Sequence, residues 1–416
     1  MTVLRRRQAM EVIDNPRRPV DEGAYSEAAV IVEAIREGGE AALRDHALRF
    51  GEINKADDPL VHDRYALEAE FAALDPEHRA LLDRTGERIR TFARAQMAGF
   101  GDLTVEVQGG LAGHRWLPVA SAGAYAPGGR HPLPSSVLMT GIPAHVAGVA
   151  QVWIASPRPT PITLGAAWVA GADGLIAVGG AHAIAALAFG TVSPPSDLIV
   201  GPGNKWVTAA KKYLYGEVGI DGLAGPSEIV VLADEGADPT LVAADLLAQA
   251  EHDTDAIPAL VTTSADLADR VDLELARQLV DLPTSSVAQV AVAGGFCVIV
   301  GDLDEGAELV DHLAPEHLAL HVADADQLAG QLRSYGSLFV GGSTAETFAD
   351  YGAGPNHVLP TGRGARFQSG LSVATFLRSP TWLRLDNPED LIPDTALLAR
   401  LEGLEAHARS AEARKK

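Results

Sequence analysis

The chain has 416 residues, enough for two or three domains, and its 47% hydrophobic and 21% charged residues are typical of a folded globular protein. Its formal net charge of -22 at pH 7 argues against a nucleic-acid or anionic-membrane partner, because such partners usually meet a basic surface. No stretch is long and apolar enough to span a bilayer, and no apolar segment follows the basic N-terminus, so we expect neither an anchor nor a secretory signal.

The first hundred residues have a helical pattern. Between Tyr25 and Gly101, runs such as SEAAVIVEAIREGGEAALRDHALRF place Ala and Leu on one face and charged residues on the other. This spacing predicts amphipathic helices whose charged faces are solvated.

Short apolar runs dominate the middle of the chain. From Gly123 to about Glu228 the candidate strands are VWIAS, LIAVGG and DLIVGPG, and each is followed by a helical segment. EIVVLAD, ALVTTS, GGFCVIVGD, ALHVAD and SLFVGG continue this alternation, which is typical of parallel sheets. The pattern predicts an α/β fold with two αβ regions and helical ends.

The single cysteine, Cys297, lies in the apolar run GGFCVIV. One cysteine makes neither an internal disulfide nor a thiolate cluster, so we expect a buried strand residue rather than a reactive thiol. The composition is compatible with a reducing cytosol, and we expect a cytoplasmic protein.

Two glycine-rich turns lie between a predicted strand and a predicted helix, in LIVGPGNKW and LIAVGGAHA. Such turns aim backbone N–H groups at an anion above the start of the helix, but they are also common as purely structural turns. Neither contains GxGxxG, so the motif does not indicate a standard dinucleotide site.

The stretch LLAQAEHD raises a packing question. Gln249 continues the helical stripe of Val242 and Leu246, and His252 follows three residues later. After VVLAD, Asp238 and Pro239 are a suitable N-cap and first residue for this helix. An amide and an imidazole on a packed helix require a partner that satisfies them.

Three further segments carry polar groups suited to chemistry. APEHLAL pairs Glu316 with His317, a common acid/base combination that also occurs by chance. The glycine-rich loop DYGAGPNHVLP offers Asp350 and His357, either as a ligand site or as a simple turn. On one continuous helix, Glu402 and His407 of EGLEAH would lie about 140° apart, which favours a solvated tail.

Together these segments supply only oxygen and nitrogen ligands for a metal. Zn²⁺ accepts imidazole nitrogen and carboxylate oxygen, and a site without thiolates is typical of catalytic zinc. The candidate ligands are Gln249, His252, Asp350 and His407. Nothing local indicates that these segments meet.

Longer motifs resemble the histidinol dehydrogenase family. They are AGAYAPGG with PSSVLM, GGAHAIAALAFGT, GPGNKWVTAAKKYLYGEVGIDGLAGPSEIVVLAD, LVAADLLAQAEHD, APEHLAL, ADYGAGPNHVLPTGRGARF with SGLSV, and EGLEAH. They occur in one order from about Ala41 to the C-terminus. The resemblance implies an oxidation of L-histidinol through L-histidinaldehyde to L-histidine, the last steps of histidine biosynthesis, with Zn²⁺ and NAD as cofactors.

The resemblance also implies a metal site that is shared between subunits. Gln249, His252 and Asp350 would hold one zinc ion per subunit, and the ligand set would be completed by His407 from the tail of the other subunit in an intertwined homodimer. This zinc would orient the substrate by its amino group and an imidazole nitrogen.

Roles at the substrate follow from the same resemblance. His317 would be the base in both oxidations, and Glu316 would activate the water that hydrates the aldehyde. Ser227 and Glu402 would contact the substrate, as would His317 and the four metal ligands. His357 is a further candidate near the substrate.

For the cofactor, Tyr125, His182 and Asn204 match the family's NAD contacts. Family members more often have Gln where this chain has His182, which places NAD affinity or its pH dependence in question. Two other departures, RHPLPSS before the NAD-side helix and Ala349 before Asp350, remove no catalytic group.

The implied fold has two incomplete Rossmann-like αβα domains. The expected division is an N-terminal arm at 1–24, a first domain at 25–122 plus 229–375, a second, NAD-binding domain at 123–228, and a helical tail at 376–416. The first domain would carry the Glu-His pair and most metal ligands.

Three other functions are compatible with the same residues. A paralogue on the same scaffold would oxidise another small polar alcohol. A zinc hydrolase would turn over its substrate without NAD, and a non-catalytic binding protein would be unaffected by His317→Asn.

Overall fold

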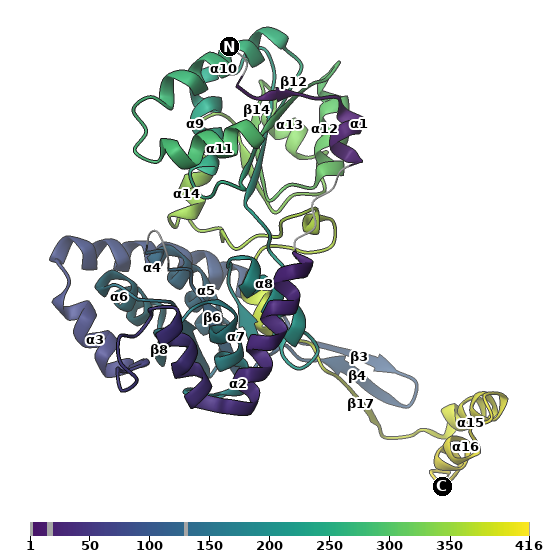
Figure 1. Ribbon diagram of the computed structural model, residues 1–416. Coiled ribbons are helices and arrows are strands. Elements are labelled where there is room, and N and C mark those ends of the chain that lie inside the picture. Colours follow the sequence, from purple (N-terminus) through teal and green to yellow (C-terminus); the bar gives the residue numbers. More distant parts are fainter. Residues whose placement is uncertain (1–2, 15–19, 129–131, 416) are drawn as a thin grey trace.

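The computed structural model describes residues 3–14, 20–128 and 132–415. In those ranges two sheets covered by helices form two bodies, and a thin arm carries a pair of helices away from both (Figure 1). We call the body of the upper sheet in this view the first body and the other the second body. The predicted α/β fold with parallel sheets is confirmed.

The sheet of the first body is parallel throughout, in the order β1-β13-β12-β11-β14-β15. Its strands are β1 (Arg5–Arg6), β11 (Glu228–Ala233), β12 (Ile257–Thr262), β13 (Phe296–Ile299), β14 (His317–His321) and β15 (Ser337–Val340). Most residues of the central strands are buried, as expected for strands with helices on both faces. The apolar runs of the sequence therefore mark these strands correctly.

Seven helices of the described chain surround this sheet: α1 (Ala9–Ile13), α9 (Pro239–Ala250), α10 (Ala265–Gln278), α11 (Ser285–Gly294), α12 (Leu303–Leu313), α13 (Ala325–Ala329) and α14 (Glu346–Asp350). The side chain of Asp238 accepts the backbone N–H of Thr240, and Pro239 is the first residue of α9. The predicted start of that helix is confirmed.

The sheet of the second body has the order β10-β9-β6-β7-β8-β2, and it is parallel except for β2, which runs antiparallel to β8. Its strands are β2 (Val61–Asp63), β6 (Ser121–Tyr125), β7 (Gln151–Ala155), β8 (Gly174–Ile176), β9 (Leu198–Val200) and β10 (Gly219–Ile220). The chain moves from β6 to β7 and β8 on one side and then to β9 on the other. A topological switch point therefore lies between β6 and β9.

The helices around this sheet pack closely through small residues. They are α2 (Glu22–Arg49), α3 (Arg64–Ala73), α4 (Pro76–Met97), α5 (Pro134–Ala147), α6 (Pro161–Ala170), α7 (Gly180–Phe189) and α8 (Lys205–Leu214). A Cβ atom on Gly141 of α5 would lie 2.8 Å from the Cβ of Ala170 on α6, so any larger residue there would force these helices apart.

Residues 25–122 were predicted to belong to the first body, and this is wrong. Helix α2 packs against α7 and α8, α3 packs against α6, α4 packs against α5 and α6, and β2 extends the second sheet. An amphipathic stripe shows that a helix covers a core, but it does not encode which of two similar sheets supplies that core.

The two ends of the chain also differ from the prediction. Of the predicted N-terminal arm at 1–24, strand β1 and helix α1 belong to the first body and residues 22–24 begin α2 of the second body, whereas residues 1–2 and 15–19 lie outside the described residues. At the other end, the predicted helical tail of 376–416 begins with strands. Before it, Leu371 and Val373 return to the core of the second body together with Phe376.

The arm is built from pairings distant in sequence. β3 (Leu103–Val107), β4 (Gly110–His114) and β17 (Thr381–Leu385) form an antiparallel sheet, and β5 (Leu117–Pro118) pairs with β16 (Leu377–Arg378). Short 3-10 turns lie at η1 (Gly364–Arg366), η2 (Val373–Phe376) and η3 (Glu389–Leu391). No helix in the described ranges is both long and apolar enough to cross a bilayer.

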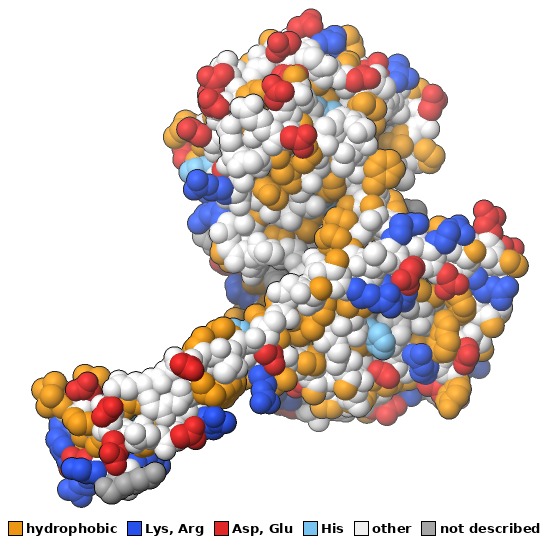
Figure 2. Space-filling view, turned by 180° about the vertical axis from the view of Figure 1, so that it is seen from behind, with side chains coloured by type: hydrophobic (Ala, Val, Ile, Leu, Met, Phe, Trp, Pro, Cys, Tyr) orange, Lys and Arg blue, Asp and Glu red, His pale blue; other side chains and the backbone are white. Residues whose placement is uncertain are grey.

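The arm ends in a helical hairpin of α15 (Ile392–Leu401) and α16 (Glu405–Glu412), which lies well away from both sheets in Figure 1. Three of its buried residues form a small apolar cluster of their own: Ala396, Ala399 and Ala408. Figure 2 shows hydrophobic side chains along the arm and the hairpin, and Leu397, Leu398 and Leu401 are each at least 60% exposed. This hairpin therefore leaves an uncovered apolar face.

Candidate functional site

The first candidate site lies at the amino edge of the first sheet. Glu228 begins β11, and His317 begins the neighbouring strand β14, directly after Glu316. Helix α9 runs back from the carboxyl end of β11, so its last turn brings Gln249 towards the same edge. Ligands of parallel sheets usually bind at the carboxyl edge, so this position departs from the common rule.

Gln249 is buried as its position in the helical stripe predicts. It is 1% exposed, and Val242 and Leu246 are fully buried beside it. Its Oε1 is buried and has no hydrogen-bond partner in the described structure. A buried amide oxygen without a donor is costly, so this atom is available to a ligand.

His252 differs from the prediction, because it does not lie on the packed helix. Helix α9 ends at Ala250, and the side chain of His252 is 47% exposed. Its backbone N–H donates to the carbonyl of Gln249 at 3.3 Å, and its Nε2 lies 3.9 Å from Oδ2 of Asp350. The end of the helix therefore turns His252 towards Asp350.

Asp350 is the last residue of α14 and is held by His357. Nδ1 of His357 lies 3.1 Å from the Asp350 carbonyl, and Nε2 lies 3.3 Å from the Ser136 hydroxyl on α5. Burial lowers the pKa of His357, which favours a neutral ring that donates through Nδ1 and accepts at Nε2. His357 thus ties Asp350 to the second body rather than pointing free towards a substrate.

His317 is oriented as a base. Its Nδ1 lies 3.2 Å from the backbone carbonyl of Glu228, which accepts the Nδ1–H, and its Nε2 is buried without a partner. Burial lowers the pKa of His317 to about 4, so the ring is neutral at neutral pH and carries a free lone pair on Nε2.

Glu316 lies beside this ring. Its Oε2 accepts the backbone N–H of Glu228 at 3.0 Å and is 3.6 Å from Nδ1 of His317. Burial raises the pKa of Glu316 well above its usual value, which brings a carboxyl group towards the range useful in acid/base catalysis. The two neighbours in APEHLAL do converge in space.

Ser227 immediately precedes β11 and is partly buried. Its backbone carbonyl accepts the N–H of Ile257 at 3.0 Å, which fixes the start of the strand. Ser227 therefore shares the amino edge with Glu228 and His317.

One acidic residue of this site is absent from the sequence prediction. Glu346, the first residue of α14, is 1% exposed, and Oε2 lies 4.0 Å from Nδ1 of His317. Neither carboxyl oxygen has a hydrogen-bond partner in the described structure, and burial raises the pKa of the group. The sequence carries no signal for it, because a Glu in the first turn of a helix is ordinarily a solvated residue.

The predicted metal ligands are only partly assembled within one chain. Oε1 of Gln249 is an orphaned acceptor, and the 3.9 Å between Nε2 of His252 and Oδ2 of Asp350 is near the upper limit for two atoms that each bind one zinc ion at about 2.0–2.2 Å. In the described ranges no three His, Cys, Asp or Glu side chains are grouped to hold a metal. The donor types fit zinc, but the set needs a further ligand.

The tail residues do not complete the set in their own chain. Glu402 is the C-cap of α15 and His407 lies in α16, and both are exposed on the hairpin that Figure 1 shows away from the first body. The single helix considered for EGLEAH is wrong, because Gly403 turns the chain with a φ of 77°. The predicted angle between Glu402 and His407 therefore does not apply.

A second candidate site is a cavity of about 710 Å³ in the second body. Its lining includes the three predicted NAD contacts, Tyr125, His182 and Asn204. Tyr125 ends β6 and Asn204 follows β9, so the cavity opens at the topological switch point of this sheet. Its volume is in the usual range for small-molecule sites.

His182 has a specific partner in this cavity. Its Nε2 lies 2.7 Å from Oε2 of Glu52, and its ring stacks on Phe50 with centroids 5.4 Å apart. The Tyr125 hydroxyl accepts the N–H of Gly180, and burial raises the pKa of Tyr125 to about 12. The histidine that departs from the family pattern is therefore fixed by a carboxylate.

Some backbone N–H groups of the glycine-rich turns already have side-chain partners. Oε1 of Glu52 accepts the N–H of Gly179 at the start of α7, and the Asn204 side chain accepts the N–H groups of Trp206 and Val207 at the start of α8. Those particular N–H groups are not free to donate to a phosphate. Arg49 and Arg158 in the cavity lining are the available cations.

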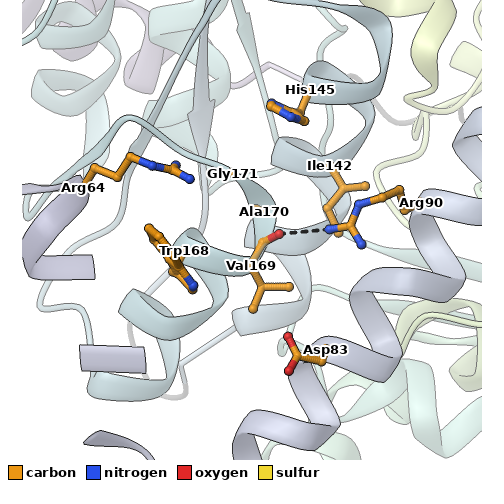
Figure 3. Close-up of a pocket in the computed structure, with 9 residues that line it drawn as sticks. All are labelled: Arg64, Asp83, Arg90, Ile142, His145, Trp168, Val169, Ala170 and Gly171. Carbon is orange, nitrogen blue, oxygen red and sulfur yellow. Dashed lines mark hydrogen bonds between the residues drawn. The ribbon is translucent and has the colours of Figure 1, made fainter. Parts of the chain in front are cut away.

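A third hollow, of about 320 Å³, contains two arginines near the end of α6 (Figure 3). Arg90 donates to the carbonyl of Val169 at 3.1 Å, and Arg64 donates to that of Ala172 at 3.0 Å and lies over the ring of Trp168. Cations at the carboxyl end of a helix stabilise its exposed carbonyls, so both arginines have a structural role.

Comparison with known proteins gives a consistent result. The family model described as histidinol dehydrogenase matches residues 16–415. Histidinol dehydrogenase of Thermus thermophilus is 46% identical over 389 residues, covering 92% of this chain and 93% of that protein, and the Cereibacter sphaeroides enzyme is 44% identical over 400 residues, covering 93% and 91%. The crystal structure of histidinol dehydrogenase from Elizabethkingia anophelis superimposes with a TM-score of 0.91 at 29% identity, covering 100% of this chain and 98% of that one.

Proposed function

The chain belongs to the histidinol dehydrogenase family, and from that premise we propose that it oxidises L-histidinol through L-histidinaldehyde to L-histidine with NAD. The observation that carries the proposal is the buried, neutral His317 with a free Nε2 beside Glu316. Asp350 and His252 lie near enough to this pair to affect the pKa of His317. The reaction would be the end of histidine biosynthesis, in the cytoplasm.

In the first oxidation, Nε2 of His317 takes the proton of the substrate hydroxyl as the carbon of the alcohol loses a hydride. The neutral ring and the contact of Nδ1 with the Glu228 carbonyl support this direction of transfer. The carbon and oxygen of the alcohol become the carbonyl group of the aldehyde. The proton on Nε2 passes to solvent before the second step.

In the second oxidation, Glu316 takes a proton from the water that adds to the aldehyde. His317 then removes a hydroxyl proton of the hydrated aldehyde as a second hydride leaves. One alcohol, one water and two NAD thus give one carboxylate, two NADH and three protons. The raised pKa of Glu316 suits a group that must both accept and return a proton.

The proposed zinc site is supported by the nitrogen and oxygen donors of its side chains. Gln249, His252 and Asp350 would hold one zinc ion per subunit, with His407 of a second copy as the remaining ligand. When bound, zinc supplies a fixed point that orients the substrate amine and imidazole. Ser227 and Glu402 would add polar contacts to the substrate.

The proposed NAD site is supported by the cavity in the second body. Tyr125, His182 and Asn204 line it together, and Arg49 and Arg158 supply positive charge for a diphosphate. When bound, NAD accepts the hydride. The cofactor would lie on an incomplete Rossmann-like sheet without the usual glycine fingerprint.

The homodimer is supported by the tail. Three leucines of the hairpin, Leu397, Leu398 and Leu401, are at least 60% exposed, and an apolar face of this kind is covered in stable assemblies. A second copy would cover it and receive Glu402 and His407 in its site. This arrangement also explains why a ligand set assembled at one body lacks a member.

The test is NADH formation from L-histidinol by wild type and His407→Ala, with and without a chelator. We expect activity in wild type that a chelator abolishes, and at least about 100-fold less in the variant. Oxidation of another small alcohol in place of histidinol would indicate a paralogous dehydrogenase. Chelator-sensitive turnover without NAD would indicate a zinc hydrolase.

A further inference from the structure

Glu346 is a buried carboxyl group that the proposed reaction does not use. It is 1% exposed, and neither oxygen has a hydrogen-bond partner in the described structure. A group of this kind costs free energy in the resting protein unless something in the working cycle satisfies it. Its position four residues before Asp350 places it at the catalytic edge.

The acidic neighbours of Glu346 cannot balance a negative charge on its carboxyl group. The nearby acids are Asp245, Glu316 and Asp350, and all three raise the pKa of Glu346 in addition to burial. Asp245 is engaged with Nε2 of His321 at 2.9 Å, and Glu316 accepts a backbone N–H. These acids offer Glu346 no counter-charge.

His317 is the neighbour that can become a cation. Its Nδ1 lies 4.0 Å from Oε2 of Glu346, which is too long for a hydrogen bond but short for an electrostatic interaction in a buried site. The backbone carbonyl of Glu228 already orients Nδ1, so Glu346 is not required to choose the tautomer. The carbonyl carries no full negative charge, so it cannot neutralise a protonated His317.

We propose that Glu346 is a positioning residue that stabilises the imidazolium of His317 after Nε2 has taken the hydroxyl proton of the substrate. The inference rests on the proposed function. In this step the substrate O–H bond breaks, an Nε2–H bond forms, and the hydride leaves the carbon for NAD. Glu346 takes part as a carboxylate, its own proton having passed to solvent, and its negative charge lowers the free energy of the imidazolium.

This role accounts for an acid left unpaired among other acids. Burial disfavours an anion at Glu346 as it disfavours a cation at His317, but each charge offsets the cost of the other. A charge on Glu346 is therefore least costly when His317 carries the transferred proton. In the resting protein the carboxyl group of Glu346 has no partner. It stabilises His317 only during the reaction, when the ring is protonated.

The test compares Glu346→Gln, which keeps the shape and removes the charge, with Glu346→Asp, which keeps the charge. Glu308→Gln, an exposed change in the same body, is the matched control. For each protein we would measure kcat, KM for histidinol, zinc content after loading, and the midpoint of thermal unfolding.

For Glu346→Gln we expect kcat to fall about 100-fold, with KM within about twofold and zinc content unchanged. Its thermal midpoint should stay within a few degrees of that of wild type, because the amide has the size of the carboxyl group and the site still buries one polar group. Glu346→Asp should recover part of the lost kcat, and Glu308→Gln should match wild type.

Four results would overturn the inference: a kcat of Glu346→Gln within twofold of wild type, equal kcat values for the Gln and Asp variants, a loss that follows zinc, or a loss that follows unfolding. The last two would make Glu346 a metal-holding or purely structural residue. A wild type that forms no NADH from histidinol would instead contradict the proposed function, whatever the variants do.

Discussion

The pair of His182 and Glu52 in the cofactor cavity gives a prediction whose size follows from the structure. Both side chains are buried, Nε2 lies 2.7 Å from Oε2, and the imidazole stacks on Phe50. A hydrogen bond to a charged group contributes about 1.5–3 kcal/mol and an aromatic contact about 0.5–1.5 kcal/mol. His182→Ala should therefore lower the free energy of unfolding by about 2–4 kcal/mol.

Urea unfolding followed by circular dichroism measures this loss, and His78→Ala, at an exposed histidine of α4, is the control. The double-mutant cycle of His182→Ala and Glu52→Ala isolates the pair, and we expect a coupling of at least about 1 kcal/mol. His182→Gln should retain most of the stability, because its amide can also donate to Glu52. If the two alanine changes are additive within about 0.5 kcal/mol, the pairing is wrong.

The orphaned oxygen of Gln249, the buried thiol of Cys297 and the isolated hairpin can each be tested separately. Gln249→Leu should leave the metal-free protein as stable as wild type or more so, because it removes an unsatisfied oxygen, while zinc affinity falls at least about tenfold by competition with a chelating dye. Cys297 should not react with a thiol reagent at pH 8 until the chain is unfolded, because burial raises its pKa to about 11; rapid reaction of the native protein would contradict this. A chain that ends at Asp386 should keep the circular-dichroism spectrum of the folded sheets, because the hairpin has its own small cluster, but lose histidinol oxidation; full activity would exclude the tail from the site.

The strands and the local geometry of helices were predictable from the sequence. Apolar runs such as EIVVLAD and GGFCVIV became strands of parallel sheets, and Asp238 capped the helix that it was expected to cap. Gln249 was correctly placed on a buried stripe. These features depend on periodicity and on capping, which a few neighbouring residues determine.

Pairings between distant segments were not predictable in the same way. The helices of 22–97 cover the second sheet, because their apolar faces fit either sheet and only the packing against α7 and α8 decides. Glu346 and Glu52 act through partners more than 25 residues away, so no local pattern marks them. His252 left the helix because α9 ended two residues earlier than the periodicity suggested.

Mixing two inactive variants tests whether each dehydrogenase site is built from the body of one chain and the tail of another. His317→Asn disables the body and His407→Ala disables the tail, so each homodimer should be nearly inactive. In a mixed dimer one site combines the intact body of one chain with the intact tail of the other. Co-expression at equal levels makes about half of the dimers mixed, and one of the two sites in each mixed dimer is intact, so we expect about one quarter of wild-type NADH formation from histidinol. Activity no greater than that of the two variants measured apart would contradict a shared site.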